Sequence, residues 1–393
     1  MSVFRQIGAV VGMNLQSIPR RLGSSSVVVI GIAGVVGVVV SIFGMNRSLG
    51  QALVDAGRPN RAVVLRNGSD GEASSTLLVD AIATIKDAPG VARTPKGDAA
   101  ATADMITTAN FKRRKDGSAA GLPIRGVEPQ AFFVRPEIKL VDGRLFNPGL
   151  RELIVGRAAQ KEFGGLDIGD HLSLRNSQWT VVGVFESGGD VNESRVLADQ
   201  ATLLSAYGRT AASSVTVLLN SEASFDEFKQ ALTTNPTLSV SVERENDYYL
   251  RQSKNATTFF GFVATFVGGI MALGALFAAL NTMYSAVSTR VVEIATLRAI
   301  GFGATGVVIS VLVESLGLAL LGAVIGAGVA WALFGGNTIS LGNTTSSLVF
   351  QMQVTPALLG VGIAWAFGVG LIGGLFPAVR AARLPVAMAL RAV

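Results

Sequence analysis

Long apolar runs, whose only charged residue is Glu314, alternate with polar stretches along the chain. Four of them are long enough to matter, and they cover residues 27–44, 256–280, 303–334 and 355–379. About 20 apolar residues cross a bilayer core as a helix, so even the first run, with 18 uncharged residues, is sufficient. The pattern therefore predicts four transmembrane helices.

The stretch between the first two runs has a different pattern. Residues 61–66, 102–112 and 122–127 read as strands, and 75–87 and 224–232 read as helices. With roughly 210 residues, this stretch is long enough for a core of its own. We expect a membrane protein with four transmembrane α-helices and a large mixed α+β extracytoplasmic domain inserted between helices 1 and 2.

Charge is distributed unevenly between these regions. The chain has 33 Lys and Arg, 27 Asp and Glu, and a net charge of +6. Residues 45–256 hold 25 basic and 25 acidic side chains, and the rest of the chain holds eight Arg and only two acids, Glu293 and Glu314. Arg residues that flank apolar runs indicate membrane topology rather than a nucleic-acid surface, so no nucleic-acid partner is expected.

The flanking Arg residues predict the orientation. They fall into three groups, which are Arg5, Arg20 and Arg21; Arg290 and Arg298; and Arg380, Arg383 and Arg391. Four spans place all three groups on one side, which should be cytoplasmic. The uncharged stretch 335–354 and the large domain then lie on the opposite side.

These observations divide the chain into nine segments. They are a cytoplasmic or interfacial N-terminal segment (1–22), the first span (23–44), the extracytoplasmic domain (45–255), the second span (256–284), a cytoplasmic helix (285–302), the third span (303–334), an extracytoplasmic loop (335–354), the fourth span (355–379) and a cytoplasmic C-terminal segment (380–393).

The first span also has features of a signal peptide, because Arg20 and Arg21 precede its apolar run. The sequence after the run, SIFGMNRSLG, lacks an A-x-A-like cleavage site, so we favour a retained helix. Residues 3–18 mix apolar and polar positions and are compatible with an interfacial helix.

Catalytic signals are scarce. The chain has no G-x-x-x-x-G-K-[ST] sequence, no Cys, and a single His at position 171 within a Gly-Asp turn. We expect no catalytic, cofactor-binding or metal-binding site in this chain.

A carboxylate and several glycines stand out inside the spans. Glu314 is a candidate for a proton relay, but a structural polar contact between helices is the favoured role. Two G-x-x-x-G pairs, Gly322 with Gly326 and Gly370 with Gly374, predict close helix packing.

Two stretches near the end of the chain carry a family resemblance. Residues 290–303 read RVVEIATLRAIGFG and residues 373–391 read GGLFPAVRAARLPVAMALR, and both resemble the FtsX-like domain that ends MacB-type ABC transporter permeases. The landmarks DGRLF, ELIVG, IGD and VVGVF between residues 142 and 220 resemble the MacB-type periplasmic core domain. Thr305-Gly306 and Leu384-Pro385 depart from the family pattern, which often has a basic residue and Asp-Pro there.

The resemblance implies a role for residues 285–302. From the residues alone, two roles are equally possible for Arg290 and Glu293: pairing with each other along one helix side, or docking on a partner. In the family this stretch is the coupling helix that docks on a separate ATPase. The resemblance therefore assigns ATPase coupling to Arg290, Glu293, Leu297, Arg298 and Gly301.

The resemblance also implies partners and a function. It implies two ABC ATPase chains that carry ATP and Mg²⁺, a second permease chain in a homo- or heterodimer, and a periplasmic adaptor or substrate-binding protein. The expected protein is a non-catalytic bacterial inner-membrane subunit that transmits ATP-driven movement to its outer domain, for export of a lipoprotein, peptide or small molecule. The alternative is an FtsX-like regulator of a cell-wall hydrolase or of an antibiotic-sensing complex.

Overall fold

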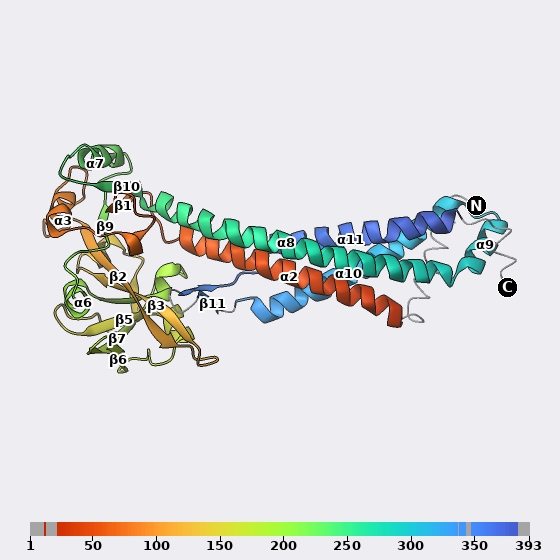
Figure 1. Ribbon diagram of the computed structural model, residues 1–393, viewed down its shortest axis with the longest axis horizontal. Helices are drawn as coiled ribbons and strands as arrows, with labels where there is room; N and C mark the ends of the chain where they lie inside the picture. Colours follow the sequence, from red (N-terminus) through yellow and green to blue (C-terminus); the bar gives the residue numbers. More distant parts are fainter. Residues whose placement is uncertain (1–11, 13–21, 337, 343–346, 384–393) are drawn as a thin grey trace. The chain divides into compact units, whose positions relative to one another are not determined.

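The computed structural model describes residue 12 and residues 22–336, 338–342 and 347–383. They form two compact units (Figure 1). A helical unit comprises residues up to Asn46, Thr258–Asn337 and Gln353 onward, and a sheet unit comprises Arg47–Thr257 and Thr338–Met352. The predicted segments 1–22 and 380–393 lie mostly outside the described residues.

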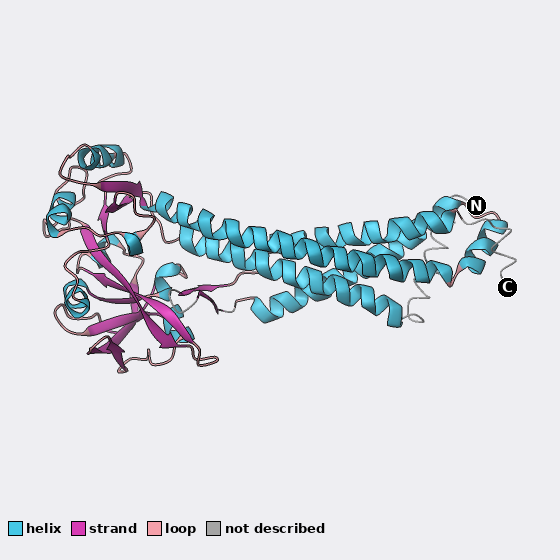
Figure 2. Ribbon diagram, viewed as in Figure 1, coloured by secondary structure: helices cyan, strands magenta, loops and turns pink. Residues whose placement is uncertain are grey.

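The helical unit is built from long apolar helices (Figure 2). Its helices are α2 (Leu22–Val54), α8 (Glu245–Ser288), α9 (Val291–Ala299), α10 (Ala304–Phe334) and α11 (Pro356–Ala382). By length and composition α2, α8, α10 and α11 can each cross a membrane, which confirms the four predicted apolar helices. Both α2 and α8 are longer than the runs that predicted them, and the unit boundary falls inside each helix.

Small residues bring the long helices together. A Cβ added at Gly326 would lie 2.3 Å from the carbonyl oxygen of Ala33 on α2, and one at Gly322 would lie 2.8 Å from that of Val29. At Gly370 and Gly374 an added Cβ would lie 2.6 Å from a Cβ of α10. Any side chain at these positions would collide with the facing helix, so only glycine lets the backbones approach this closely. Such close packing holds helices together in lipid, where apolar contact alone gives no drive.

The sheet unit contains a ten-stranded mixed sheet with the order β10-β1-β9-β2-β3-β8-β5-β7-β4, in which β6 pairs with β7. The strands are β1 (Arg61–Arg66), β2 (Ala101–Lys112), β3 (Ala119–Val127), β4 (Lys139–Gly143), β5 (Glu152–Gly156), β6 (His171–Leu174), β7 (Ser177–Glu186), β8 (Val196–Asp199), β9 (Ser214–Leu218) and β10 (Val240–Arg244). The pairs β3–β8 and β5–β7 are parallel, and the other pairs are antiparallel.

Short helices border this sheet. They are η2 (Glu72–Ser74), α3 (Val79–Lys86), α4 (Ala131–Val134), α5 (Arg157–Glu162), η3 (Val191–Ser194), α6 (Gln200–Tyr207) and α7 (Ser224–Thr233). The predicted strands and the helix at 224–232 are confirmed. The helix predicted over 75–87 is wrong in its first turn, because Leu77 instead bridges to Ala212 as extended backbone and α3 begins at Val79.

Besides a smaller cluster around Val127, Ile154 and Phe185, the described sheet unit has two hydrophobic cores that meet along β2. One lies among β10, β1, β9 and the first half of β2, and the other among the second half of β2, β3, β8, β5 and β7. Strand β2 passes from one core to the other, since Ala103 belongs to the first and Met105 to the second. Asp104 therefore lies at the joint between the two cores.

The predicted extracytoplasmic loop over 335–354 contains two strands among its described residues. They are β11 (Thr338–Gly342) and β12 (Ser347–Gln351), which pair antiparallel, and β12 lies against β3 and η3 of the sheet unit. These strands were not predicted from the sequence, although alternating apolar residues such as Ile339, Leu341 and Val349 are typical of strands.

Candidate functional site

The helix predicted to contact an ATPase is α9, a nine-residue element between α8 and α10. It ends in a Schellman motif, in which the Phe302 N–H donates to the Leu297 carbonyl at 3.0 Å and the Gly301 N–H donates to the Arg298 carbonyl at 3.2 Å. Gly301 has a φ of +97°, which a residue with a side chain rarely adopts. Gly301 therefore ends the helix and turns the chain toward α10.

A buried ion pair holds the start of α9. Arg290 Nη1 lies 3.4 Å from Glu314 Oε2 of α10, and the two residues are 6% and 4% exposed. The structure thus pairs Arg290 with Glu314, where pairing along the helix with Glu293 was the alternative to docking. Arg290 is buried and supports α9 from the inside, and its role in ATPase coupling stays a prediction.

The interior around this pair includes a small cavity of about 30 Å³. Glu293 and Leu297 of α9 line it together with Arg290 and Glu314. The Glu293 side chain is otherwise exposed, and Leu297 is half-buried. One side of α9 therefore packs inward while Glu293 remains accessible.

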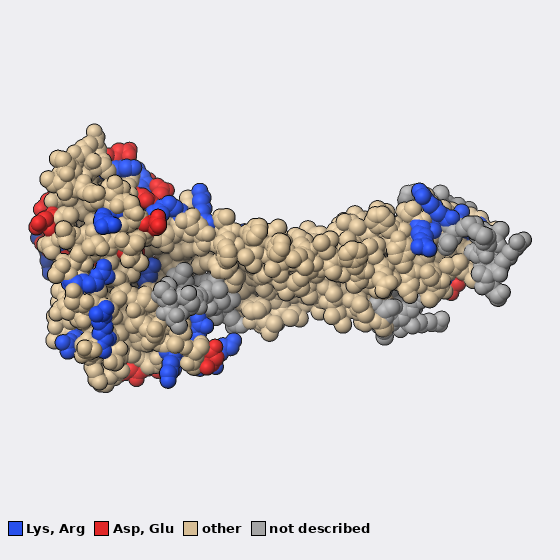
Figure 3. Space-filling model, viewed as in Figure 1, with Lys and Arg blue, Asp and Glu red and all other residues tan. Residues whose placement is uncertain are grey.

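A second contact holds the end of α9. Arg298 Nη1 donates a hydrogen bond of 2.8 Å to the carbonyl oxygen of Ala382, the last residue of α11. The Arg380 guanidinium lies 5.5 Å from the centre of the Tyr284 ring of α8. Figure 3 shows basic side chains gathered at this end of the helical unit. The Arg298 contact therefore ties α9 to α11, and the Arg380 contact ties α11 to α8.

The remaining predicted residues in the spans lie apart from this end. Gly322 and Gly326 face α2, and Gly370 and Gly374 face α10. The structure thus places Arg290, Glu293, Leu297 and Arg298 in or next to α9 and brings Glu314 of α10 to them. The four glycines have a separate role in packing.

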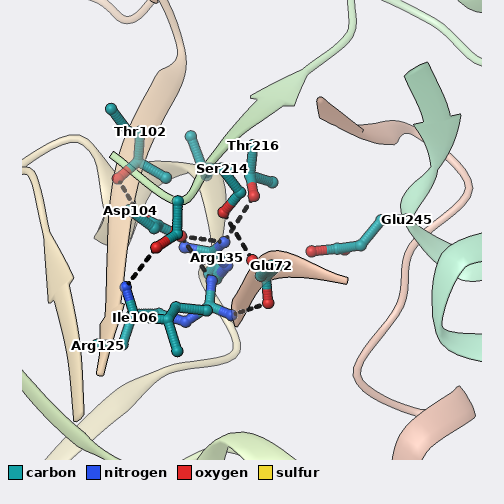
Figure 4. Close-up of polar contacts among 12 residues, drawn as sticks. Glu72, Thr102, Asp104, Ile106, Arg125, Arg135, Ser214, Thr216 and Glu245 are labelled. Carbon is teal, nitrogen blue, oxygen red and sulfur yellow. Dashed lines mark hydrogen bonds and ion pairs between the residues drawn. The ribbon is translucent and has the colours of Figure 1, made fainter. Parts of the chain in front are cut away.

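The sheet unit contains a cluster of buried charges that the sequence did not predict (Figure 4). Arg125 of β3 donates to Asp104 Oδ2 and to Glu72 Oε2, each at 2.6 Å. Arg135, which follows α4, donates to the same Asp104 oxygen and to Thr216 Oγ1, each at 2.8 Å. All four charged residues are buried, and they sit at the joint between the two cores.

The surroundings of Asp104 determine its ionisation. Burial alone would raise the pKa of the Asp104 carboxyl, but the charges of Arg135 and Arg125 and a hydrogen bond from Thr102 outweigh burial and lower that pKa below its usual value of 3.8. The pKa of Arg125 is raised by Glu72 and Asp104 against the opposing effect of its burial. The pKa of Arg135 is likewise raised by Asp104, so Asp104, Arg125 and Arg135 are ionised near neutral pH.

A second buried group lies at the start of α8. Arg61 of β1 donates from Nε to Glu245 Oε2 at 2.5 Å, and its Nη1 lies 2.7 Å from Glu137 Oε1. Its remaining donors contact the carbonyl oxygens of Val134 at 2.9 Å and Ala56 at 3.2 Å.

The sequence contained a signal for these groups. Arg61 begins the apolar run of β1, Asp104 stands between Ala103 and Met105 of β2, and Arg125 interrupts the apolar strand β3, all where a core side chain is expected. Buried charges require partners, so such interruptions predict ion pairs even though they do not say which residues meet.

Among the described residues, no group of three or more His, Cys, Asp or Glu is arranged to hold a metal ion. The buried acids face Arg side chains instead, which indicates a structural role for them.

Comparisons with known proteins follow the division into two units. The family model of the MacB-like periplasmic core domain matches residues 24–235, and that of the FtsX-like permease C-terminal domain matches residues 265–386.

Curated relatives are similar over much of the chain. A macrolide export ATP-binding/permease protein MacB of Neisseria gonorrhoeae is 24% identical over 401 residues, covering 96% of this chain and 58% of that protein. The MacB protein of Brucella abortus is 25% identical over 244 residues, covering 58% of this chain and 35% of that protein. The chain thus spans little more than half the length of the relatives it matches.

Among solved structures, the periplasmic region of MacB from Actinobacillus actinomycetemcomitans is similar to this chain with a TM-score of 0.37 and 14% identity, over 50% of this chain and 93% of that one.

Proposed function

Because the chain belongs to the family of MacB-like and FtsX-like ABC transporter permeases, we propose that it couples ATP hydrolysis by a partner ATPase to movement of its sheet unit. In this proposal the movement drives export or extraction of a lipoprotein, a peptide or a small molecule. The chain itself carries no catalytic residue, and ATP and Mg²⁺ bind to an ABC ATPase outside residues 1–393.

The observation that carries the proposal is the way α9 is held. Its first turn rests on the buried Arg290–Glu314 pair, and its last turn is bound to α11 through Arg298. A displacement of the exposed Glu293 would therefore be transmitted through these contacts to α10 and α11. A short helix fixed at both ends is suited to receive movement from a motor.

The proposed topology follows the Arg distribution. Residues 285–302 and both termini would face the cytoplasm, and residues 45–255 would lie outside the inner membrane. The proposed assembly contains two ATPase subunits and a second permease chain, with a periplasmic adaptor or substrate-binding protein as a further partner.

Charge reversal at Glu293 tests the coupling role. Glu293 is an exposed acid in the first turn of α9, and Glu227 is an exposed acid in the first turn of α7, so Glu227→Lys is a matched control. Each reversal removes about 0.3–1 kcal/mol of favourable interaction with a helix N-terminus. A difference between the two variants in ATPase association or ATP turnover that exceeds this effect would indicate a contact of Glu293 with a partner.

The measurement is co-purification of the ATPase and ATP turnover at matched membrane levels. Glu293→Lys should lose most ATPase association or most chain-stimulated turnover, and Glu227→Lys should keep both. Full assembly and full turnover in Glu293→Lys would contradict the assignment of α9 as the coupling helix.

A further inference from the structure

The end of α2 and the beginning of α8 meet inside the sheet unit. An added Cβ at Gly57 would lie 2.7 Å from the Asn246 Cα, so the chain leaving α2 passes directly over the start of α8. Ser253 of α8 donates to the Gly50 carbonyl at 3.3 Å. The end of α2 and the start of α8 therefore pack against each other within this unit, and we call this pair the helix base.

One side chain fastens the helix base to the sheet. Arg61 of β1 contacts Ala56, which follows α2, through Nη2, and Glu245, the first residue of α8, through Nε. Glu245 also accepts a hydrogen bond of 3.1 Å from the Arg58 N–H. Arg61 and Glu245 are each 1% exposed, so water does not compete for these bonds.

The same group reaches the joint between the two cores. Arg61 contacts Val134 at the end of α4, and the next residue, Arg135, binds Asp104. In addition, the Glu72 N–H donates to the Tyr248 hydroxyl at 3.2 Å, which ties the first turn of α8 to the cluster drawn in Figure 4. The start of α8 is thus bonded to the elements that join both halves of the sheet.

We propose that Arg61 and Glu245 are positioning residues that clamp the start of α8 to the sheet, so that movement of this helix carries the sheet unit as a rigid body. This inference rests on the proposed function, because α8 is a single helix from Glu245 to Ser288, immediately before α9. Without the clamp, α8 would turn or slide against the sheet and lose part of its displacement.

The test uses two spin labels within the sheet unit, attached to Ala83→Cys on α3 and Leu250→Cys on α8. Both positions are exposed, and the chain has no native Cys to compete for the label. The distance distribution between the labels is measured by double electron–electron resonance in the complete complex with its ATPase in lipid nanodiscs, without nucleotide and with trapped nucleotide.

In the otherwise native chain the distribution should be narrow and equal in both states. Glu245→Gln should make it at least about twofold broader, because the buried Arg61 then loses the carboxylate that ties it to α8 and keeps only that of Glu137, and should make it depend on nucleotide. Glu152→Gln is the matched control: it breaks the Arg144–Glu152 pair of the same unit, away from α8, and should leave the distribution narrow.

An unchanged narrow distribution in Glu245→Gln would overturn the inference. If that variant does not fold, Arg61→Lys replaces it: the charge is kept, but one ammonium cannot reach Glu245, Val134 and Ala56 together, so the distribution should again broaden. Glu245→Asp should restore part of the narrow distribution.

The outcome is separate from the test of the proposed function. If the native chain fails to bind an ATPase, the proposed function fails, and the nucleotide-free comparison of the native chain with Glu245→Gln still decides whether the clamp exists.

Discussion

Arg290 and Glu314 are 24 residues apart in the sequence, and their side chains meet at 3.4 Å beneath α9. Each would be costly in an apolar bundle alone, and each supplies the charge that the other needs. The pair connects the residue before α9 to the middle of α10, so the two most unusual charges of the helical unit explain one another.

This pair predicts an asymmetric response to substitution. Arg290→Met should destabilise the helical unit by about 3–5 kcal/mol, because it leaves Glu314 buried without its partner. Arg290→Met combined with Glu314→Leu should cost clearly less, since no unpaired charge remains. Thermal unfolding in nanodiscs measures both, and equal destabilisation by the single and double variants would contradict the ion-pair role.

The close contact of α10 with α2 predicts a steric effect at Gly326. Gly326→Ala should destabilise the helix bundle by about 1–3 kcal/mol, because its Cβ would press on the carbonyl oxygen of Ala33. Gly328→Ala is the control, since nothing lies within 4 Å of a Cβ there. Unfolding by detergent titration should separate the two, and equal stabilities would show that α2 and α10 are not packed in this way.

The Arg distribution predicts opposite accessibility of two exposed sites. A thiol introduced by Ser118→Cys in the sheet unit should react with a membrane-impermeant maleimide added to spheroplasts. A thiol introduced by Thr289→Cys, just before α9, should react only after permeabilisation. Labelling of both from outside would refute the proposed topology.

Asp104 predicts a pH-dependent contribution to stability. Its folded pKa is lower than its unfolded pKa, so its stabilising effect is complete above the unfolded value of about 3.9 and is lost as pH falls through the folded pKa. Asp104→Asn should therefore lower stability at pH 7, and its difference from the native chain should shrink below about pH 4.

Asp190 provides a control of opposite sign, because burial raises the pKa of its carboxyl against hydrogen bonds from Asn192 and Ser187. The stability difference for Asp190→Asn should shift in the other direction as pH falls. Thermal unfolding followed by the fluorescence of buried Trp179, with Trp331 and Trp365 replaced by Phe, measures both variants. Parallel pH profiles would contradict the opposite pKa directions.

Several site residues were predictable because their signal is local. The four packing glycines follow from spacing within single helices. Gly301 was predicted only as a coupling residue, and its role as the helix end came from the structure. Glu314 was recognised as unusual because a carboxylate in an apolar run is rare. Its partner, Arg290, could not be predicted from the sequence, because Glu293 is close to Arg290 in the sequence. Only the path of α10 brings Glu314 to Arg290 instead.

The sequence by itself determined the four apolar helices and the mixed domain, because transfer of apolar runs out of water depends on composition and length. It also placed the strands β1, β2 and β3, since alternation is a local property. Tertiary structure alone decided that strands 338–342 and 347–351 pair within the sheet unit, that Arg61 meets Glu245, and that Arg125 and Arg135 share Asp104. Such contacts depend on strand order and register, which bring residues that are distant in the sequence within 3 Å of one another. Strand order and register cannot be predicted from a short segment of sequence.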